Sequence, residues 1–143
     1  MKICQTSVFL ENIKGRLYEV LNILSKSDIN ILALSIADTS EFGILRMIVN
    51  NPKKAKVVLT SEGLSVSEND VLAVGMSDSP GAFVDVLSVL KENNINVEYT
   101  YAFLSKLDEK AVMIIRTEDI TETVELLNKN NIVLFGEDDL FNI

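Results

Sequence analysis

The residues best suited to chemistry in this chain lie at two short turns, each with a glycine three residues after a polar side chain. The glycines are Gly15 and Gly81, and the polar residues are Asn12 and Asp78. Each glycine is predicted to begin a helix, and the free N–H groups of a helix N-terminus attract a carboxylate. A carbonyl or carboxylate oxygen of Asn12 or Asp78 could accept a hydrogen bond from an ammonium group. Each turn is therefore suited to an α-amino acid, whose two charges lie close together.

Each turn opens a segment that occurs twice in the chain. From Gly15 to Ile31, and again from Gly81 to Val97, the apolar residues keep the same spacing, and the repeat carries Leu24 onto Leu90. Internal repetition on this scale indicates two modules of one design. The structural alternative for the glycines is a tight strand-to-helix turn without a ligand, and for the polar residues it is helix capping.

Composition closes most catalytic options. The chain has 143 residues, a formal net charge of −8, one cysteine and no histidine. Without histidine, the commonest general base and metal ligand is missing, although carboxylate chemistry stays open. An acidic chain does not favour nucleic acid or an anionic membrane surface, and no apolar run approaches the roughly 20 residues of a membrane span. The composition predicts a cytoplasmic protein without cofactor, metal, nucleic-acid partner or membrane association.

The hydrophobic periodicity predicts the same order of elements in each half. In the first half, strands are expected over residues 3–10, 30–38, 44–49 and 64–66, with helices along the apolar stripe of Leu17, Val20, Leu21 and Leu24 and after Pro52. In the second half, strands are expected over 71–77, 97–104, 111–117 and 132–135, with helices after Gly81 and around 120–127. Each half is βαββαβ, an α+β, ferredoxin-like module with two helices on one face of a four-stranded sheet. The polar segment between the halves is short, so we expect sheets joined side by side.

The two turns resemble the Asp/Asn-x-x-Gly-x-Leu/Phe junction of the ACT domain family, whose members sense small molecules and accompany amino-acid biosynthetic enzymes or stand alone. The stretch over residues 35–46 is similar to that of small bacterial proteins made of two such domains. The resemblance covers essentially the whole chain and implies ACT-like domains over residues 1–68 and 69–143. The second turn is close to the family pattern, whereas the first lacks its proline.

In ACT proteins, paired modules commonly join their edge strands, and ligands lodge at the seam. The resemblance therefore implies a pocket whose near wall is a glycine turn and whose far wall is the second strand of a module. The ligand-binding residues expected at the first turn and second strand of the first half are Asn12, Ile13, Lys14, Gly15, Arg16, Leu17, Ser35, Ile36, Ala37 and Asp38. Those expected in the second half are Asp78, Ser79, Pro80, Gly81, Ala82, Phe83, Tyr99, Thr100, Tyr101 and Ala102.

The function implied is a non-catalytic regulatory protein that binds a free amino acid between its two ACT domains. The alternative is a regulatory or structural subunit that docks onto an amino-acid biosynthetic enzyme without a small ligand, with Tyr99, Tyr101 and Phe103 as the docking face. The same alternating aromatics occur on RNA-binding strands, but the basic surface of such modules is missing. A homodimer is a further candidate assembly.

Overall fold

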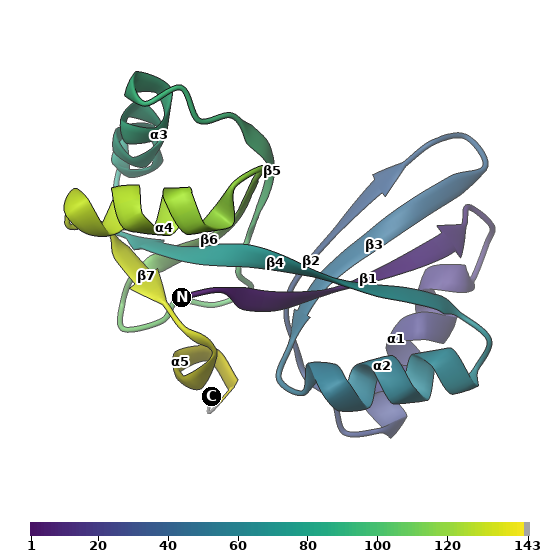
Figure 1. The fold of residues 1–143 in the computed structure, drawn as a ribbon. Coiled ribbons are helices and arrows are strands. Elements are labelled where there is room, and N and C mark those ends of the chain that lie inside the picture. The colour runs from purple at the N-terminus through teal and green to yellow at the C-terminus, as the bar shows by residue number, and fades with distance from the viewer. Residues whose placement is uncertain (142–143) are drawn as a thin grey trace. The chain divides into compact units, whose positions relative to one another are not determined.

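The computed structural model describes residues 1–141 and divides into two compact units (Figure 1). The first module consists of Cys4–Asn69 with Phe141, and the second of Met1–Ile3 with Asp70–Leu140. The elements in chain order are β1 (Ile3–Glu11), α1 (Arg16–Lys26), β2 (Ile31–Asp38), β3 (Phe42–Val49), α2 (Pro52–Ser61), β4 (Ser65–Met76), α3 (Ala82–Glu92), β5 (Val97–Ala102), β6 (Ala111–Thr117), α4 (Ile120–Lys129), β7 (Val133–Phe135) and α5 (Glu137–Phe141).

Both modules have the βαββαβ order, which confirms the predicted α+β, ferredoxin-like fold. The strand order is β2-β3-β1-β4 in the first module and β5-β6-β4-β7 in the second. The pairs β1–β3, β2–β3, β4–β6, β4–β7 and β5–β6 are antiparallel. The β1–β3 ladder, for example, runs from Thr6 opposite Met47 to Glu11 opposite Phe42. In each module the second strand, β2 or β5, therefore lies at a sheet edge, as expected.

The prediction of separate strands over 64–66 and 71–77 was wrong, because one strand, β4, runs through both ranges. The polar residues from Glu68 to Asp70 are exposed within this strand. Strand pairing uses backbone groups, so side chains that face solvent need not end a strand. The boundary between the two modules consequently lies inside a strand, between Asn69 and Asp70, with no linker loop.

Each module has its own hydrophobic core, formed where two helices pack on one face of the sheet (Figure 1). In the first module, Val20 and Leu24 of α1 and Leu59 of α2 pack against the strand residues Leu45 and Met47. In the second module, the repeat-related residues of α3, Val86 and Leu90, belong to an equivalent cluster. The apolar stripes seen in the sequence are thus the core-facing stripes of the helices, and they hold the start of each helix in place.

One buried hydroxyl in the first core lacks a partner, and its removal should stabilise the protein. Thr6 of β1 is fully buried, and its Oγ1 atom has no hydrogen-bond partner among residues 1–141. The repeat-related position in the second module is the core residue Leu72. We expect Thr6→Val to raise the free energy of unfolding by about 1–2 kcal/mol, because an unsatisfied buried polar group costs about 1–3 kcal/mol.

Urea denaturation measures this difference, and Thr123→Val is the matched control. The Thr123 hydroxyl is also buried, but it lies 2.7 Å from Thr117 Oγ1 and donates to the carbonyl of Asp119 at 2.8 Å. The control should therefore be destabilised. A loss of stability in Thr6→Val would contradict the prediction.

Candidate functional site

The two predicted turns place a glycine at the start of α1 and of α3. Gly15 and Gly81 are the N-cap residues, with φ angles of 86° and 82°, and neither helix has a side-chain cap. This left-handed backbone suits glycine because it lacks a Cβ atom. The first-turn N–H groups of Leu17 and Tyr18 have no acceptor among the described residues, and those of Phe83 and Val84 likewise have none. Both turns therefore present free, positively polarised amides.

The other two long helices have capped N-termini. The Asn51 side chain accepts a hydrogen bond from the N–H of Lys54 at 3.1 Å at the start of α2. At the start of α4, the Asp119 carboxylate accepts one from the N–H of Glu122 at 2.9 Å. Uncapped amides are thus a property of the repeated turns and are not general to the helices of this chain.

Asn12 does not cap α1, so the capping interpretation of this residue was wrong. Its backbone N–H donates to the carbonyl of Glu41 at 2.8 Å. Its side-chain Nδ2 lies 3.4 Å from the carbonyl oxygen of Thr39 and 3.5 Å from that of Ser40. Asn12 therefore links the glycine turn to the hairpin between β2 and β3. Its side chain makes no capping hydrogen bond to α1.

Asp78 makes the equivalent tie in the second module, and it does not cap α3 either. Its Oδ2 atom lies 2.8 Å from Nζ of Lys106, in the hairpin between β5 and β6. Lys106 occupies the position that Ser40 has in the repeat. The hydrogen bond and charge of Lys106 hold the pKa of Asp78 below its usual value. The turn and hairpin of the second module are thus joined by an exposed ion pair, whereas those of the first module are joined by neutral hydrogen bonds.

Replacing Lys106 with methionine should raise the pKa of Asp78 toward its usual value. Because the folded-state pKa is lowered, the ion pair contributes stability above the ordinary carboxyl pKa and loses it as the pH falls through the lowered value. An NMR titration that follows the Asp78 side-chain carboxyl carbon measures the change. Lys110→Met, in the same hairpin, is the control and should leave the Asp78 titration in place. An unchanged titration in Lys106→Met would disprove the pairing.

The remaining turn residues are mostly at the surface. The Arg16 guanidinium lies 2.9 Å from Glu19 and 3.7 Å from Glu11, so acids of its own module already hold it. The hydroxyls of Ser77 and Ser79 are 2.8 Å apart. Leu17 and Phe83 pack against the cores, which anchors each turn from below. The turn residues that are exposed are Asn12, Ile13, Lys14, Gly15, Asp78, Ser79, Pro80 and Gly81, whereas Ala82 is half-buried.

The second strand of the first module ends beside the first turn. Ala37 and Asp38 line a cavity of about 390 Å³ together with Phe9, Phe42 and Thr39, the last being the residue whose carbonyl lies nearest the Asn12 amide. Ser35 is opposite Arg46 in the β2–β3 ladder, and Ile36 is partly exposed. Part of the predicted strand segment is therefore brought close to the predicted turn of its own module.

The side chains of the second strand of the second module are mostly buried or hydrogen-bonded within their own module. Tyr101 is buried, Tyr99 is half-buried, and the Thr100 hydroxyl donates to the carbonyl of Ile114 at 2.7 Å. Thr100 and Ala102 are the exposed residues of this segment, and the Thr100 hydroxyl is already used in its hydrogen bond to Ile114. The expected role of each second strand as the far wall of the other module's pocket stays a prediction.

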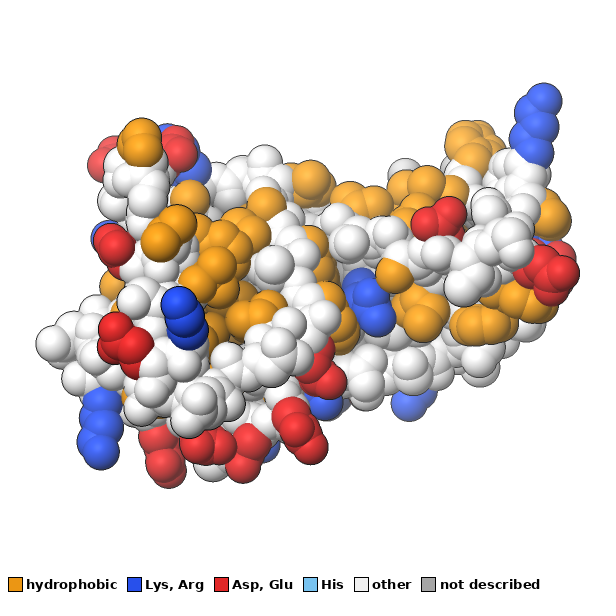
Figure 2. Space-filling model, turned by 90° about the horizontal axis from the view of Figure 1, so that it is seen from above, with side chains coloured by type: hydrophobic (Ala, Val, Ile, Leu, Met, Phe, Trp, Pro, Cys, Tyr) orange, Lys and Arg blue, Asp and Glu red, His pale blue; other side chains and the backbone are white. Residues whose placement is uncertain are grey.

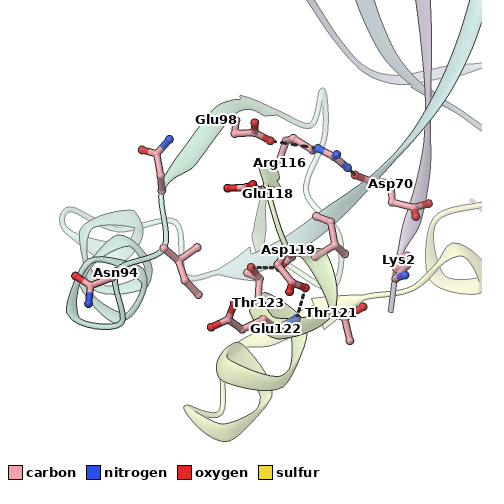
Figure 3. A pocket seen from close by; sticks show the side chains of 13 residues that line it. Lys2, Asp70, Asn94, Glu98, Arg116, Glu118, Asp119, Thr121, Glu122 and Thr123 are labelled. Carbon is pink, nitrogen blue, oxygen red and sulfur yellow. Dashed lines mark hydrogen bonds and ion pairs between the residues drawn. The ribbon is translucent and has the colours of Figure 1, made fainter.

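A charged cavity of about 710 Å³ in the second module was missed by the sequence analysis (Figure 3). It lies at the start of α4, where Arg116 Nε is 3.4 Å from Glu98 and its Nη1 donates to the carbonyl of Asp70. Glu118, Asp119 and Glu122 also line it. The three acids at positions 118, 119 and 122 were the available signal in the sequence. The first module has a concavity at the repeat-related position, lined by Asn30 and Asn50 among others.

Hydrophobic side chains reach the surface of both modules on the face seen in Figure 2. Among residues 1–141, the exposed large hydrophobic side chains include Phe9, Phe42 and Val84. Within residues 1–141, no helix has both the length and the apolar character needed to cross a bilayer. In the same part of the chain, no three side chains of the metal-ligating types are grouped for an ion.

Comparison with known proteins identifies the family. The family model described as an ACT domain pair matches residues 1–143. The chain belongs to the ACT domain pair family. This membership confirms the resemblance seen at the two turns, and a search of curated proteins finds no match.

Solved structures of this architecture include a similar protein from Bacteroides thetaiotaomicron. That protein, BT0572, is 36% identical to this ACT domain pair, with a TM-score of 0.92 over 100% of this chain and 98% of its own. The regulatory subunit of aspartate kinase from Thermus thermophilus is 13% identical, with a TM-score of 0.61 over 88% and 91% of the two chains. Aspartokinase III from E. coli, solved in complex with lysine and aspartate, is 16% identical, with a TM-score of 0.50 over 90% of this chain and 31% of its own.

Proposed function

We propose that this ACT domain pair is a non-catalytic, cytoplasmic regulatory protein that binds a free amino acid at its glycine turns. The observation that carries the proposal is the pair of uncapped helix N-termini at Gly15 and Gly81, where the other long helices are capped. Free first-turn amides are the groups that bind a carboxylate. The E. coli aspartokinase III structure, of which about a third resembles this chain, was solved in complex with lysine and aspartate.

The groups beside each turn suit the rest of an α-amino acid. Asp78 carries a charge that could exchange Lys106 for the ammonium group of a ligand, because their ion pair is exposed and exposed ion pairs are weak. The carbonyls of Thr39 and Ser40, held near Asn12, are ammonium acceptors in the first module. The output is a ligand-dependent change in how the protein contacts its partner, for which an amino-acid biosynthetic enzyme is the candidate.

Thermal unfolding across the common amino acids tests this proposal. A ligand present at 100 times its dissociation constant should add about 2.7 kcal/mol of stability. Silence across the whole panel would overturn the proposal, and copurification with an enzyme despite that silence would favour the docking alternative.

Glycine variants separate ligand binding from backbone strain. Gly81 and Gly63 both have a φ of 82°, and an added Cβ atom would meet nothing within 4 Å at either position. Gly81→Ala and Gly63→Ala should therefore lose similar stability, about 1–2 kcal/mol. Gly63 follows the end of α2 and belongs to neither repeated turn, so ligand response should fall only in Gly81→Ala and Gly15→Ala. An equal response in all of these variants would contradict a site at the turns.

A further inference from the structure

We propose that the ligand of the first module is an amino acid with a large apolar side chain, which lodges against Phe9 and Phe42, and that the chain takes one such ligand. This inference rests on the proposed function and specifies its substrate class. The cavity of about 390 Å³ falls in the size range of small-ligand pockets, roughly 300–1,000 Å³.

The walls of this cavity are aromatic and exposed. Phe9 of β1 and Phe42 of β3 stack with ring centroids 5.2 Å apart and an interplanar angle of 26°. The two residues are 50% and 40% exposed. Ile44 and Ala37 extend the apolar surface. Large aromatic surface left in water is costly, and an apolar side chain placed on it would recover burial and ring contacts.

The polar edge of the cavity supplies the complement to an amino acid. Asp38 lines the cavity, and its carboxylate has no hydrogen bond or ion pair within residues 1–141. It is therefore available to an ammonium group. Thr39 lines the same cavity, and its carbonyl oxygen lies 3.4 Å from Nδ2 of Asn12. That contact places Asn12 of the glycine turn at the polar edge of the cavity.

The second module has lost this arrangement. The residues at the positions of Phe9 and Phe42 are Gly75 and Asp108. The space beside Gly75 is filled by Phe135, whose ring lies 2.6 Å from the place where a Cβ atom would be. The position of Ala37 is taken by Phe103. Within residues 1–141, the second module therefore lacks the aromatic pair at this position, which is why we expect one apolar ligand.

Calorimetric titration of the full chain tests the inference. The ligands are leucine, isoleucine, valine, methionine and phenylalanine, against serine, threonine, aspartate and lysine. For the apolar set we expect one binding event per chain, with tighter binding than for the polar set. Ala37→Phe, which copies the second module and fills the cavity, and Phe42→Ala, which removes a wall, should each weaken that binding about tenfold or more. Val57→Ala, an exposed apolar residue of α2, is the control and should bind like the unmodified chain.

The outcomes separate this inference from the proposed function. Binding that prefers polar amino acids, that reaches two apolar ligands per chain, or that survives both Ala37→Phe and Phe42→Ala would overturn the inference and leave amino-acid sensing intact. Silence with every amino acid would overturn both. If Phe42→Ala changes only the oligomeric state in size-exclusion chromatography, the cavity is covered by a second copy of the chain and the inference is wrong. Circular dichroism of each variant shows whether it remains folded.

Discussion

Replacing Leu90 with alanine should lower the free energy of unfolding by about 2–5 kcal/mol. Leu90 is 1% exposed on the inner face of α3, within the cluster that also holds Leu72, Val86 and Ile115. The substitution removes buried methyl groups and leaves a cavity that the surrounding residues fill only in part. Leu90 lies near the C-terminal end of α3, far along the helix from Gly81. We therefore expect the substitution to lower the stability of the protein without changing the conformation of the Gly81 turn.

The repeat supplies a matched experiment for this prediction. Leu24 is the related residue of α1, and it is fully buried in the first core. Leu24→Ala should lose a similar amount, while Val84→Ala, an exposed position of α3, should stay within about 0.5 kcal/mol. Guanidinium denaturation gives the energies, and amide hydrogen exchange assigns each loss to a module. A loss below about 1 kcal/mol in both leucine variants would show that these helices do not anchor the cores.

The repeated element order could be predicted because each module repeats its apolar spacing. Leu17, Val20, Leu21 and Leu24 follow one helical face, and the structure places α1 over these residues. The division between strands within β4 could not be predicted in the same way. Side-chain polarity at Glu68–Asp70 indicated an interruption, whereas backbone pairing continued through it. Hydrophobic patterning reports which side chains are buried, and it reports strand ends only indirectly.

The glycines of the candidate site were predictable, but the roles of its polar residues were not. A glycine before a helical stripe signals a turn that needs a positive φ, as at Gly15 and Gly81. Asn12 and Asp78 are also common capping residues, and local sequence favours capping. Their partners are hairpin groups far along the chain, such as Lys106 for Asp78. Tertiary contacts of this kind have no local signal, and the Phe9–Phe42 stack likewise arises only from the β1–β3 pairing.

Gly75 of β4 should tolerate no side chain, and Gly75→Ala should cost about 1–3 kcal/mol. Its backbone φ is not in the left-handed region, so alanine meets no backbone strain there. An added Cβ atom would instead lie 2.6 Å from Cε2 of Phe135 and 3.2 Å from Cγ1 of Val133. Phe135 is 5% exposed, so its ring cannot swing freely into solvent. Forcing an extra carbon into packed surroundings displaces side chains and backbone, which is the source of the loss.

Gly43 of β3 is the matched control for this prediction, because it is also a strand glycine outside the left-handed region. The nearest atom to an added Cβ would be 3.5 Å away, on Ile36, which is an ordinary contact. Gly43→Ala should therefore be neutral or gain up to about 1 kcal/mol through the unfolded chain. Phe135→Leu should reduce the cost of Gly75→Ala, so the two substitutions should be non-additive in urea denaturation. Equal losses in Gly75→Ala and Gly43→Ala, with additive behaviour at Phe135, would show that the ring does not fill the place of a side chain at Gly75.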